Sequence, residues 1–435
     1  MTTHVANTKG QLNSIKLQIL TTNEMEGILV NSLVVFLFLF VNPIYALFFC
    51  AFLNLTSLRI NYWVFSFMFT LSFALLFFLK DYSPDNFPNN SDIVFYIQQF
   101  KIIHNLSWSE IFYQFISKPH GNEPLFWIYY KVAWILLSGS TILFVFFHYF
   151  ITFSLIVYIA KIVDANKFVI LSLCILLVNF SVFITLFQAW RHTFAFLLLF
   201  IGILSFDIKN RKWFPRIMIY SSMLVHISTA IIVIIFEVFT LLTKRKSYKL
   251  ETIKLHNKEI IGYTLLMALA FFSAVKYGLF LAKRFNFYEA VNIYYQTIIT
   301  QGTGFDLLNW FTLLICVFLW INQKKMTNAD VFIASQYFIF SVLLINLPMP
   351  DAFARYNYYI IIGGAILIGK LVATVNFRLG IILLTSLFCY DIYSINYSTE
   401  LVKTFSERLY SGYLNPAYGL TAMILNYDTI LNFKF

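Results

Sequence analysis

Long apolar runs, separated by short polar segments, recur along almost the whole chain and are the feature that most constrains its fold. A helix needs about 20 consecutive apolar residues to cross a hydrocarbon core of roughly 30 Å. Many segments of this chain meet that requirement. The sequence therefore predicts an all-α, polytopic integral membrane protein with about 11 to 14 transmembrane helices. We expect a single membrane domain over residues 1–435, because no soluble domain separates from it.

The expected membrane segments can be placed on the sequence to within several residues. Their limits are 28–53, 61–79, 122–137, 141–160, 168–187, 190–206, 213–242, 260–280, 306–321, 330–347, 358–372 and 379–395. The run 122–137 fits the topology poorly, since it begins and ends on the outer side of the membrane. Three interpretations are open: the run dips into the bilayer, it lies along the membrane surface, or the count of spans is wrong by one.

Composition excludes several classes of protein. Hydrophobic residues make up 60% of the chain and charged residues 12%, against roughly 45–50% and 25% in soluble domains. Low charge and high hydrophobicity also exclude intrinsic disorder. Four Cys in 435 residues are too few for a disulfide scaffold. The net charge is +11, but the basic residues do not cluster on a folded polar domain that could bind nucleic acid. We therefore expect no nucleic-acid partner.

The distribution of Lys and Arg predicts the orientation, because these residues concentrate in cytoplasmic loops. The basic clusters are Lys161/Lys167, Lys209/Arg211/Lys212/Arg216, Lys244/Arg245/Lys246/Lys249/Lys254/Lys258, Lys324/Lys325 and Lys370/Arg378. With these clusters in the cytoplasm, the hairpin turn before Arg191 lies on the outer side. Segment 80–121, whose charge is acidic, and the tail 396–435 are expected outside as well.

The stretch 213–242 begins and ends in the cytoplasm by this topology, yet it is too short for two full crossings. It predicts a re-entrant or short helical hairpin that turns around His226. The turn contains several polar residues, and irregular backbone at membrane depth must be buried in protein or line a wet cavity.

Five ionisable residues lie inside apolar runs or at their borders: Asp92, Glu123, Arg191, His226 and Arg355. Such residues cost about 2.5–3.5 kcal/mol each on insertion scales, so each needs a partner or a role. The expected topology places all five on or near the outer face. We treat this convergence as the candidate functional site.

Each candidate also has a plainer interpretation. Asp92 shares a helix face with Tyr96, four residues later, but also suits a helix N-terminus. Glu123 precedes Pro124 and could serve as a helix cap. His226 could be a hydrogen-bonded structural residue at a turn or a titratable base or anion ligand.

The arginines have two interpretations as well. Arg191 follows Gln188 and precedes His192 at a helix start, and Arg355 precedes Tyr356. Either guanidinium could simply extend to the membrane interface, or could bind phosphate through paired N–H groups. Gln188, His192, Tyr96 and Tyr356 are the expected supporting residues.

Other signals are weak. The His residues show no metal-ligand spacing, and no Gly-rich loop suits a nucleotide, so neither a metal nor a cofactor is expected. Lys131, Lys276 and Glu237, which also lie in apolar runs, are interpreted as structural or as reaching the interface.

Four short motifs resemble the EpsG-like family of exopolysaccharide and O-antigen polymerases, the Wzy type. They are Asp92 with Tyr96, Glu123-Pro124, Arg191 opening an apolar helix, and His226 with Ser228. The resemblance covers about residues 80–240, and beyond it only Arg355 with its tyrosines is similar. One departure is His192, where the family often has Gln after the Arg.

The resemblance implies a glycan polymerase in the bacterial cytoplasmic membrane, working on its outer face. Such an enzyme joins undecaprenyl-diphosphate-linked oligosaccharide repeat units into O-antigen, capsule or exopolysaccharide. We expect Arg191 and Arg355 to bind the diphosphate, and Glu123, Asp92 or His226 to take the proton from the attacking hydroxyl. Expected partners are the lipid-linked oligosaccharides, membrane lipids, a chain-length regulator and a flippase.

Two other functions use the same substrate. A flippase or transporter for the lipid-linked oligosaccharide would bind it near the midplane through the same charges, with charge spread through the bundle centre and some repeat symmetry. An O-antigen ligase would transfer the finished glycan to lipid A or protein. The sugars, the linkage and the stereochemical outcome are not readable from the sequence.

Overall fold

The computed structural model describes residues 22–41, 45–46, 49, 53, 62–78, 92–111, 123–162, 186, 189–205, 213–226, 229–246, 382 and 386. Within these residues the secondary structure is helical, and none of them forms a strand. The all-α class predicted from the sequence is confirmed for this part of the chain.

The helices follow the apolar runs closely. Their bounds are α1 Thr22–Val41, α3 Tyr62–Phe78, α4 Asp92–Ile102, the 3₁₀ helix η1 Ile103–Asn105, α6 Pro124–Leu136, α7 Thr141–Ile162, α10 Trp190–Ser205, α11 Phe214–Val225 and α12 Ala230–Lys246. Six of the expected membrane segments lie entirely or almost entirely outside the described residues: 168–187, 260–280, 306–321, 330–347, 358–372 and 379–395. The tail 396–435 lies outside them too.

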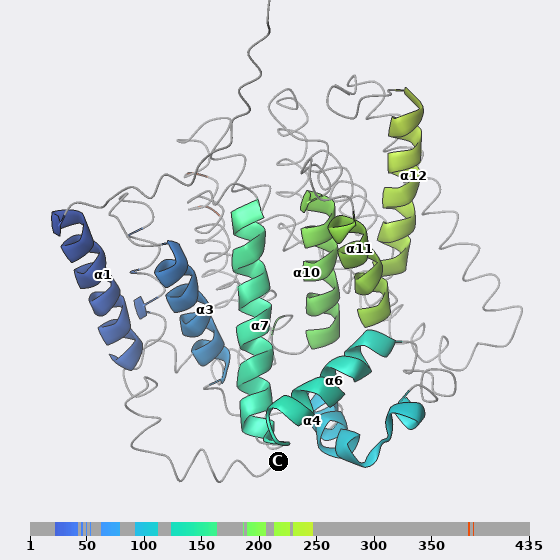
Figure 1. Cartoon of the computed structure of the whole chain (residues 1–435), viewed down its shortest axis with the longest axis horizontal. Coiled ribbons are helices and arrows are strands. Elements are labelled where there is room, and N and C mark those ends of the chain that lie inside the picture. The colour runs from blue at the N-terminus through green and yellow to red at the C-terminus, as the bar shows by residue number, and fades with distance from the viewer. Residues whose placement is uncertain are drawn as a thin grey trace, which may run out of the picture.

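The longer helices stand next to one another in chain order, from α1 through α3, α7 and α10 to α11 and α12 (Figure 1). Helix α10 packs against α7 on one side and α11 on the other. Its apolar sequence is buried almost all round, as expected of a helix that is hydrophobic on every face. Helix α10 is therefore the centre of the described core.

Helices α10 and α11 approach closely at Gly202, which lies over the first turns of α11. A Cβ added at Gly202 would stand 2.5 Å from Ile219 Cγ1 and 2.8 Å from the Pro215 carbonyl oxygen. Only a residue without a side chain permits this separation of the two backbones. Because α10 carries Arg191 and α11 leads to His226, the contact fixes the distance between two candidate site residues.

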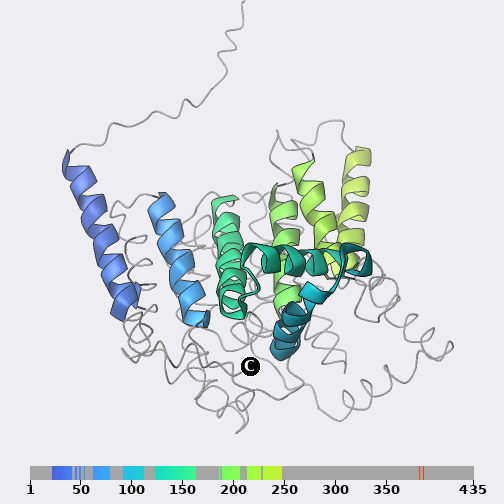
Figure 2. The same ribbon diagram turned by 60° about the horizontal axis from the view of Figure 1, so that its bottom comes forward.

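Helix α6 differs from the others in length and direction. It lies at the lower end of α7 and α10 in Figure 1, close to α4, and crosswise to both helices in Figure 2. Its 13 residues span about 20 Å at 1.5 Å per residue, which is less than a bilayer core. The helix is therefore short and lies crosswise to its neighbours, and the place of 122–137 in the topology stays a prediction.

The turn from α6 to α7 is short and well defined. Ser138 and Gly139 both have positive φ, 51° and 73°, and the Gly139 N–H donates to the Trp134 carbonyl at 2.9 Å. This 6→1 bond is typical of a Schellman ending. Ser140 then caps α7, accepting a bond from the Leu143 N–H at 3.3 Å. The corner sets α6 crosswise to α7.

The helical hairpin expected around residue 226 is present. Helix α11 ends at Val225, the next residue, His226, has an extended backbone, and α12 begins at Ala230. The two helices run back along each other, since the Tyr220 hydroxyl donates to Glu237 Oε1 at 2.9 Å. Glu237 thus has a structural partner, in agreement with its interpretation from sequence.

Among the described helices, α7 alone is long and apolar enough to cross a membrane, judged by length and composition. Shorter apolar helical stretches occur at Met25–Leu39, Ser66–Leu75, Trp190–Ser205 and Phe214–Val225. The larger number of crossings stays a prediction.

Several helices expose apolar side chains. On α1, Met25, Leu29 and Leu33 recur every four residues and are 57%, 71% and 56% exposed. This spacing places them on one face of the helix. Trp213, which precedes α11, is also strongly exposed.

Candidate functional site

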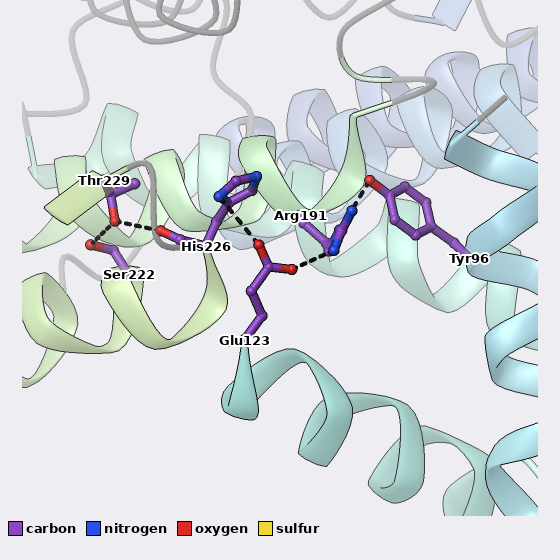
Figure 3. A network of polar contacts seen from close by, with 6 residues as sticks. All are labelled: Tyr96, Glu123, Arg191, Ser222, His226 and Thr229. Atoms are coloured by element: carbon purple, nitrogen blue, oxygen red, sulfur yellow. Dashed lines mark hydrogen bonds and ion pairs between the residues drawn. The ribbon is translucent and has the colours of Figure 1, made fainter. Parts of the chain in front are cut away.

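Glu123 stands at the start of α6, where Pro124 occupies the first helical position. Proline suits this position because its φ is already helical and its missing N–H needs no partner there. The Glu123 side chain makes no capping bond to its own helix, and the residue is 6% exposed. Glu123 thus stands at the N-cap position, as its plainer interpretation has it, but its carboxylate forms no capping hydrogen bond and points toward residues on other helices (Figure 3).

Arg191, in the first turn of α10, is the main partner of Glu123. Its Nη1 lies 2.5 Å from Glu123 Oε2, and its Nε donates to the Tyr96 hydroxyl at 3.3 Å. The guanidinium also lies 5.2 Å from the centre of the Tyr96 ring and 5.9 Å from that of Phe95. With 14% of its side chain exposed, Arg191 is held inside the protein and does not extend to the interface.

His226 completes the cluster from the end of α11. Its Nδ1 lies 3.3 Å from Glu123 Oε1, the oxygen that does not face Arg191. The Thr229 hydroxyl donates to the His226 carbonyl at 2.9 Å, and the Ser222 hydroxyl donates to Thr229 Oγ1 at 3.3 Å (Figure 3). These bonds hold the backbone at the break between α11 and α12, where His226 lies.

A second imidazole lies against the first. The rings of His192 and His226 have centroids 3.6 Å apart and are tilted by 53°. His192 is 4% exposed and follows Arg191 directly. His192, which was expected as a supporting residue, thus packs on His226.

A layer of buried aromatic rings packs against the cluster at Tyr96. The Trp190 indole stacks on Tyr96 at 5.5 Å and on His148 at 4.1 Å. Its Nε1 donates to the Tyr149 hydroxyl at 3.2 Å, and the Tyr129 hydroxyl lies 3.2 Å from His148 Nδ1. These bonds satisfy the polar atoms of a buried aromatic layer. The layer positions Tyr96 and Arg191 relative to α7.

The cluster combines one carboxylate, one guanidinium and an imidazole in a largely buried place. Arginine has five N–H donors in a fixed fork, and Arg191 Nη2 donates to none of the described residues. These donors can bind an anionic oxygen. Within the described residues, no three His, Cys, Asp or Glu side chains could hold a metal ion together.

The structure brings five of the residues predicted from sequence into one cluster: Tyr96, Glu123, Arg191, His192 and His226. Asp92 is the first residue of α4, a position that fits its plainer interpretation as a helix N-terminal residue. Gln188, Arg355 and Tyr356 lie outside the described residues.

The sequence did not single out Tyr130 of α6, and it marked its neighbour Lys131 only as structural or as reaching the interface. Tyr130 lies two turns after Glu123 with its ring buried, and a seven-residue spacing from a border carboxylate was the available signal. Lys131 Nζ donates to three carbonyls at the end of α4 and η1, those of Ile103, His104 and Leu106, at 3.1, 3.3 and 2.7 Å. The structural interpretation of Lys131 is confirmed.

No protein-family model, curated protein or solved structure matches the chain. The site is therefore interpreted from its own geometry.

Proposed function

We propose that the chain is a membrane glycan polymerase, a glycosyltransferase that uses an undecaprenyl-diphosphate-linked glycan as donor. It joins lipid-linked repeat units at the outer face of the bacterial cytoplasmic membrane. The protein would cross the membrane about 11 to 14 times, with the Glu123 cluster on the outer side. The apolar side chains exposed on α1, α11 and α12 support a lipid environment, since soluble proteins rarely expose large apolar surfaces.

One observation carries this proposal: Arg191 is buried beside a carboxylate and an imidazole, yet retains N–H donors for a ligand. A buried ion pair contributes little net stability and is often matched by apolar residues of similar volume. The cluster draws on α4, α6, α10 and the α11–α12 break. A purely structural pair would need neither the histidine nor the unused donors.

The proposed reaction moves a glycan from its diphosphate to a sugar hydroxyl. The hydroxyl oxygen of the acceptor unit attacks the anomeric carbon of the donor, and the bond from that carbon to the diphosphate oxygen breaks. The diphosphate leaves with the bonding electrons, and Arg191 stabilises its growing charge. The proton of the attacking hydroxyl passes to Glu123.

Glu123 is the preferred base because both of its oxygens lie in the cluster. A neighbouring guanidinium favours the charged form of a carboxylate and so makes it a poor proton acceptor. When the diphosphate takes up part of the Arg191 charge, this effect weakens and Glu123 accepts a proton more readily. His226 is the second candidate base, or a phosphate ligand when protonated.

The test is the surface-polysaccharide ladder of a deletion strain complemented with wild type, Arg191→Ala, Glu123→Gln or His226→Ala. Collapse to a single repeat unit, with each variant still in the membrane, is the expected result. Arg216→Ala, which removes an arginine from the first turn of α11, at the end of that helix opposite His226, is the matched control and should keep the full ladder.

The alternatives give different patterns. A flippase would leave no lipid-linked glycan on the outer side, so that the single-repeat product would also be missing. A ligase would leave full-length polymer on its lipid carrier. A full-length ladder from Arg191→Ala would contradict the proposed role of the cluster.

A further inference from the structure

Tyr130 on α6 is a buried tyrosine whose hydroxyl has no hydrogen-bond partner in the described part of the chain. The residue is 2% exposed. Nearly all buried polar groups in proteins are hydrogen-bonded, and leaving one unsatisfied costs free energy. A tyrosine kept here in place of phenylalanine therefore calls for an explanation.

The position of Tyr130 links it to the Glu123 cluster. It lies about two helical turns after Glu123, the residue that precedes α6, and long helical side chains lean toward the helix N-terminus. Its ring contacts Phe126 at 4.7 Å and Phe144 at 5.5 Å. Phe126 in turn contacts Tyr96 at 5.9 Å. The Tyr130 ring thus belongs to the aromatic packing that reaches Tyr96 in the cluster.

Electrostatics agree with this placement. The Tyr130 hydroxyl lies within electrostatic range of both Arg191 and Glu123. The neutral hydroxyl offers a hydrogen-bond donor from α6, and Arg191 Nη2 offers further donors from α10. Each residue thus has a hydrogen-bond donor that no described residue accepts, and each comes from a helix that borders the Glu123 cluster.

We propose that Tyr130 is a further ligand-binding residue, whose hydroxyl donates to a phosphate oxygen that Arg191 also binds. This inference rests on the proposed function and adds a second contact to the diphosphate subsite. An anionic oxygen accepts several hydrogen bonds at once, and bonds to charged acceptors are stronger than neutral ones. The hydroxyl gains its partner when the diphosphate arrives, which explains why it lacks one before.

A tyrosine outside the Glu123 cluster provides a matched control. The Tyr220 hydroxyl on α11 already has a partner, Glu237 Oε1, at 2.9 Å. Tyr220→Phe removes a satisfied hydrogen bond and should lower the melting temperature slightly without changing diphosphate binding. Tyr130→Phe removes only an unsatisfied hydroxyl, so the melting temperature should stay the same or rise.

The experiment measures binding of inorganic pyrophosphate and of undecaprenyl diphosphate to the purified full chain in lipid nanodiscs, by calorimetry. Tyr130→Phe should bind both about 10-fold more weakly than wild type, the loss expected for one hydrogen bond to a charged group. A loss for undecaprenyl diphosphate alone would also support the inference and would show that the lipid is needed to seat the phosphate.

Two outcomes distinguish the failures. If wild type binds the diphosphates and Tyr130→Phe binds them equally well, the inference on Tyr130 is wrong while the proposed function stands. If wild type and Arg191→Ala both bind neither diphosphate, the proposed diphosphate site itself is overturned, and the inference with it.

Discussion

Glu110 and Glu123 are both glutamates in the first turn of a helix or just before it, yet they use their carboxylates in opposite ways. Glu110 Oε2 accepts bonds from the Ser107 N–H at 2.6 Å and the Ser107 hydroxyl at 2.7 Å. The Glu110 N–H donates back to Ser107 Oγ at 3.2 Å. This reciprocal pair is a capping box. Glu123 instead bonds to Arg191, from a helix 68 residues away in the chain.

The difference between the two glutamates follows from their surroundings. Glu110 is exposed, so water and its own backbone satisfy it at little cost. Glu123 is buried, and a buried charge must find an opposite charge and further hydrogen bonds. Glu110 therefore stabilises only its own turn, through Ser107. Glu123, at a similar position, connects the start of α6 to α10 and to the end of α11.

The largest expected effect comes from Glu123→Ala. Removing one member of a buried pair leaves Arg191 without its counter-charge and costs about 3 kcal/mol, at the lower end of the range because Arg191 keeps some exposure. Thermal unfolding of the purified chain in detergent should show a clearly lower melting temperature. The double variant Glu123→Ala/Arg191→Met should regain part of this loss. If the loss of stability in the double variant equals the sum of the losses in the two single variants, the two side chains do not interact.

Gly202→Ala should have the next largest effect. The added Cβ would overlap Ile219 and the Pro215 carbonyl, so α10 and α11 must separate, at about 1–3 kcal/mol. Because this shift moves Arg191 relative to His226, the polysaccharide ladder should shorten as the melting temperature falls. Gly27→Ala, at a glycine with open space around it, is the control. A Gly202→Ala protein of normal stability would contradict the close packing described here.

Ser107→Ala should act only on the other glutamate. Loss of a helix cap typically costs about 1 kcal/mol, and here it should appear as faster amide exchange in the turn at 108–111. The ladder should keep its full length, since Ser107 has no contact with the Glu123 cluster. A shortened ladder would mean that the two regions are coupled.

The smallest expected effect concerns pH. The hydroxyl and backbone N–H of Ser107 hold the pKa of Glu110 below its ordinary value of 4.5. The carboxylate therefore stabilises the turn at pH values above 4.5, and this contribution is lost as the pH falls through the lowered pKa. A carboxyl-carbon NMR titration of the full chain should show it. In Ser107→Ala the pKa should return toward 4.5.

Much of the helical architecture could be predicted from hydrophobicity alone. The runs 61–79, 141–160 and 190–206 correspond closely to α3, α7 and α10, because an apolar run of that length has few alternatives to a helix. The break at His226 was also predicted, from topology and from its polar neighbours. Burial cost singled out Glu123, Arg191 and His226 as residues that need partners.

The pairing itself could not be predicted. Nothing in the sequence says that Glu123 meets Arg191 and not the nearer Lys131, since that depends on α6 turning crosswise at Ser138 and Gly139. Tyr130 was hidden for a related reason: it is one aromatic residue among many in an apolar run. Only the missing hydrogen bond of its hydroxyl distinguishes Tyr130 from the other aromatic residues of the run. A missing hydrogen bond can be recognised only in the folded structure. The Ser107-x-x-Glu110 signature was present in the sequence and could have been used.

The three carbonyl bonds of Lys131 have a mechanical consequence. They fasten the end of α4 and η1 to the middle of α6, so Tyr96 and Glu123 belong to one braced frame. Arg191 reaches into that frame from α10 and bonds to both sides of it. A movement of α10 relative to this frame would therefore stretch both bonds of Arg191 at the same time. The two bonds to the guanidinium are expected to form and break together.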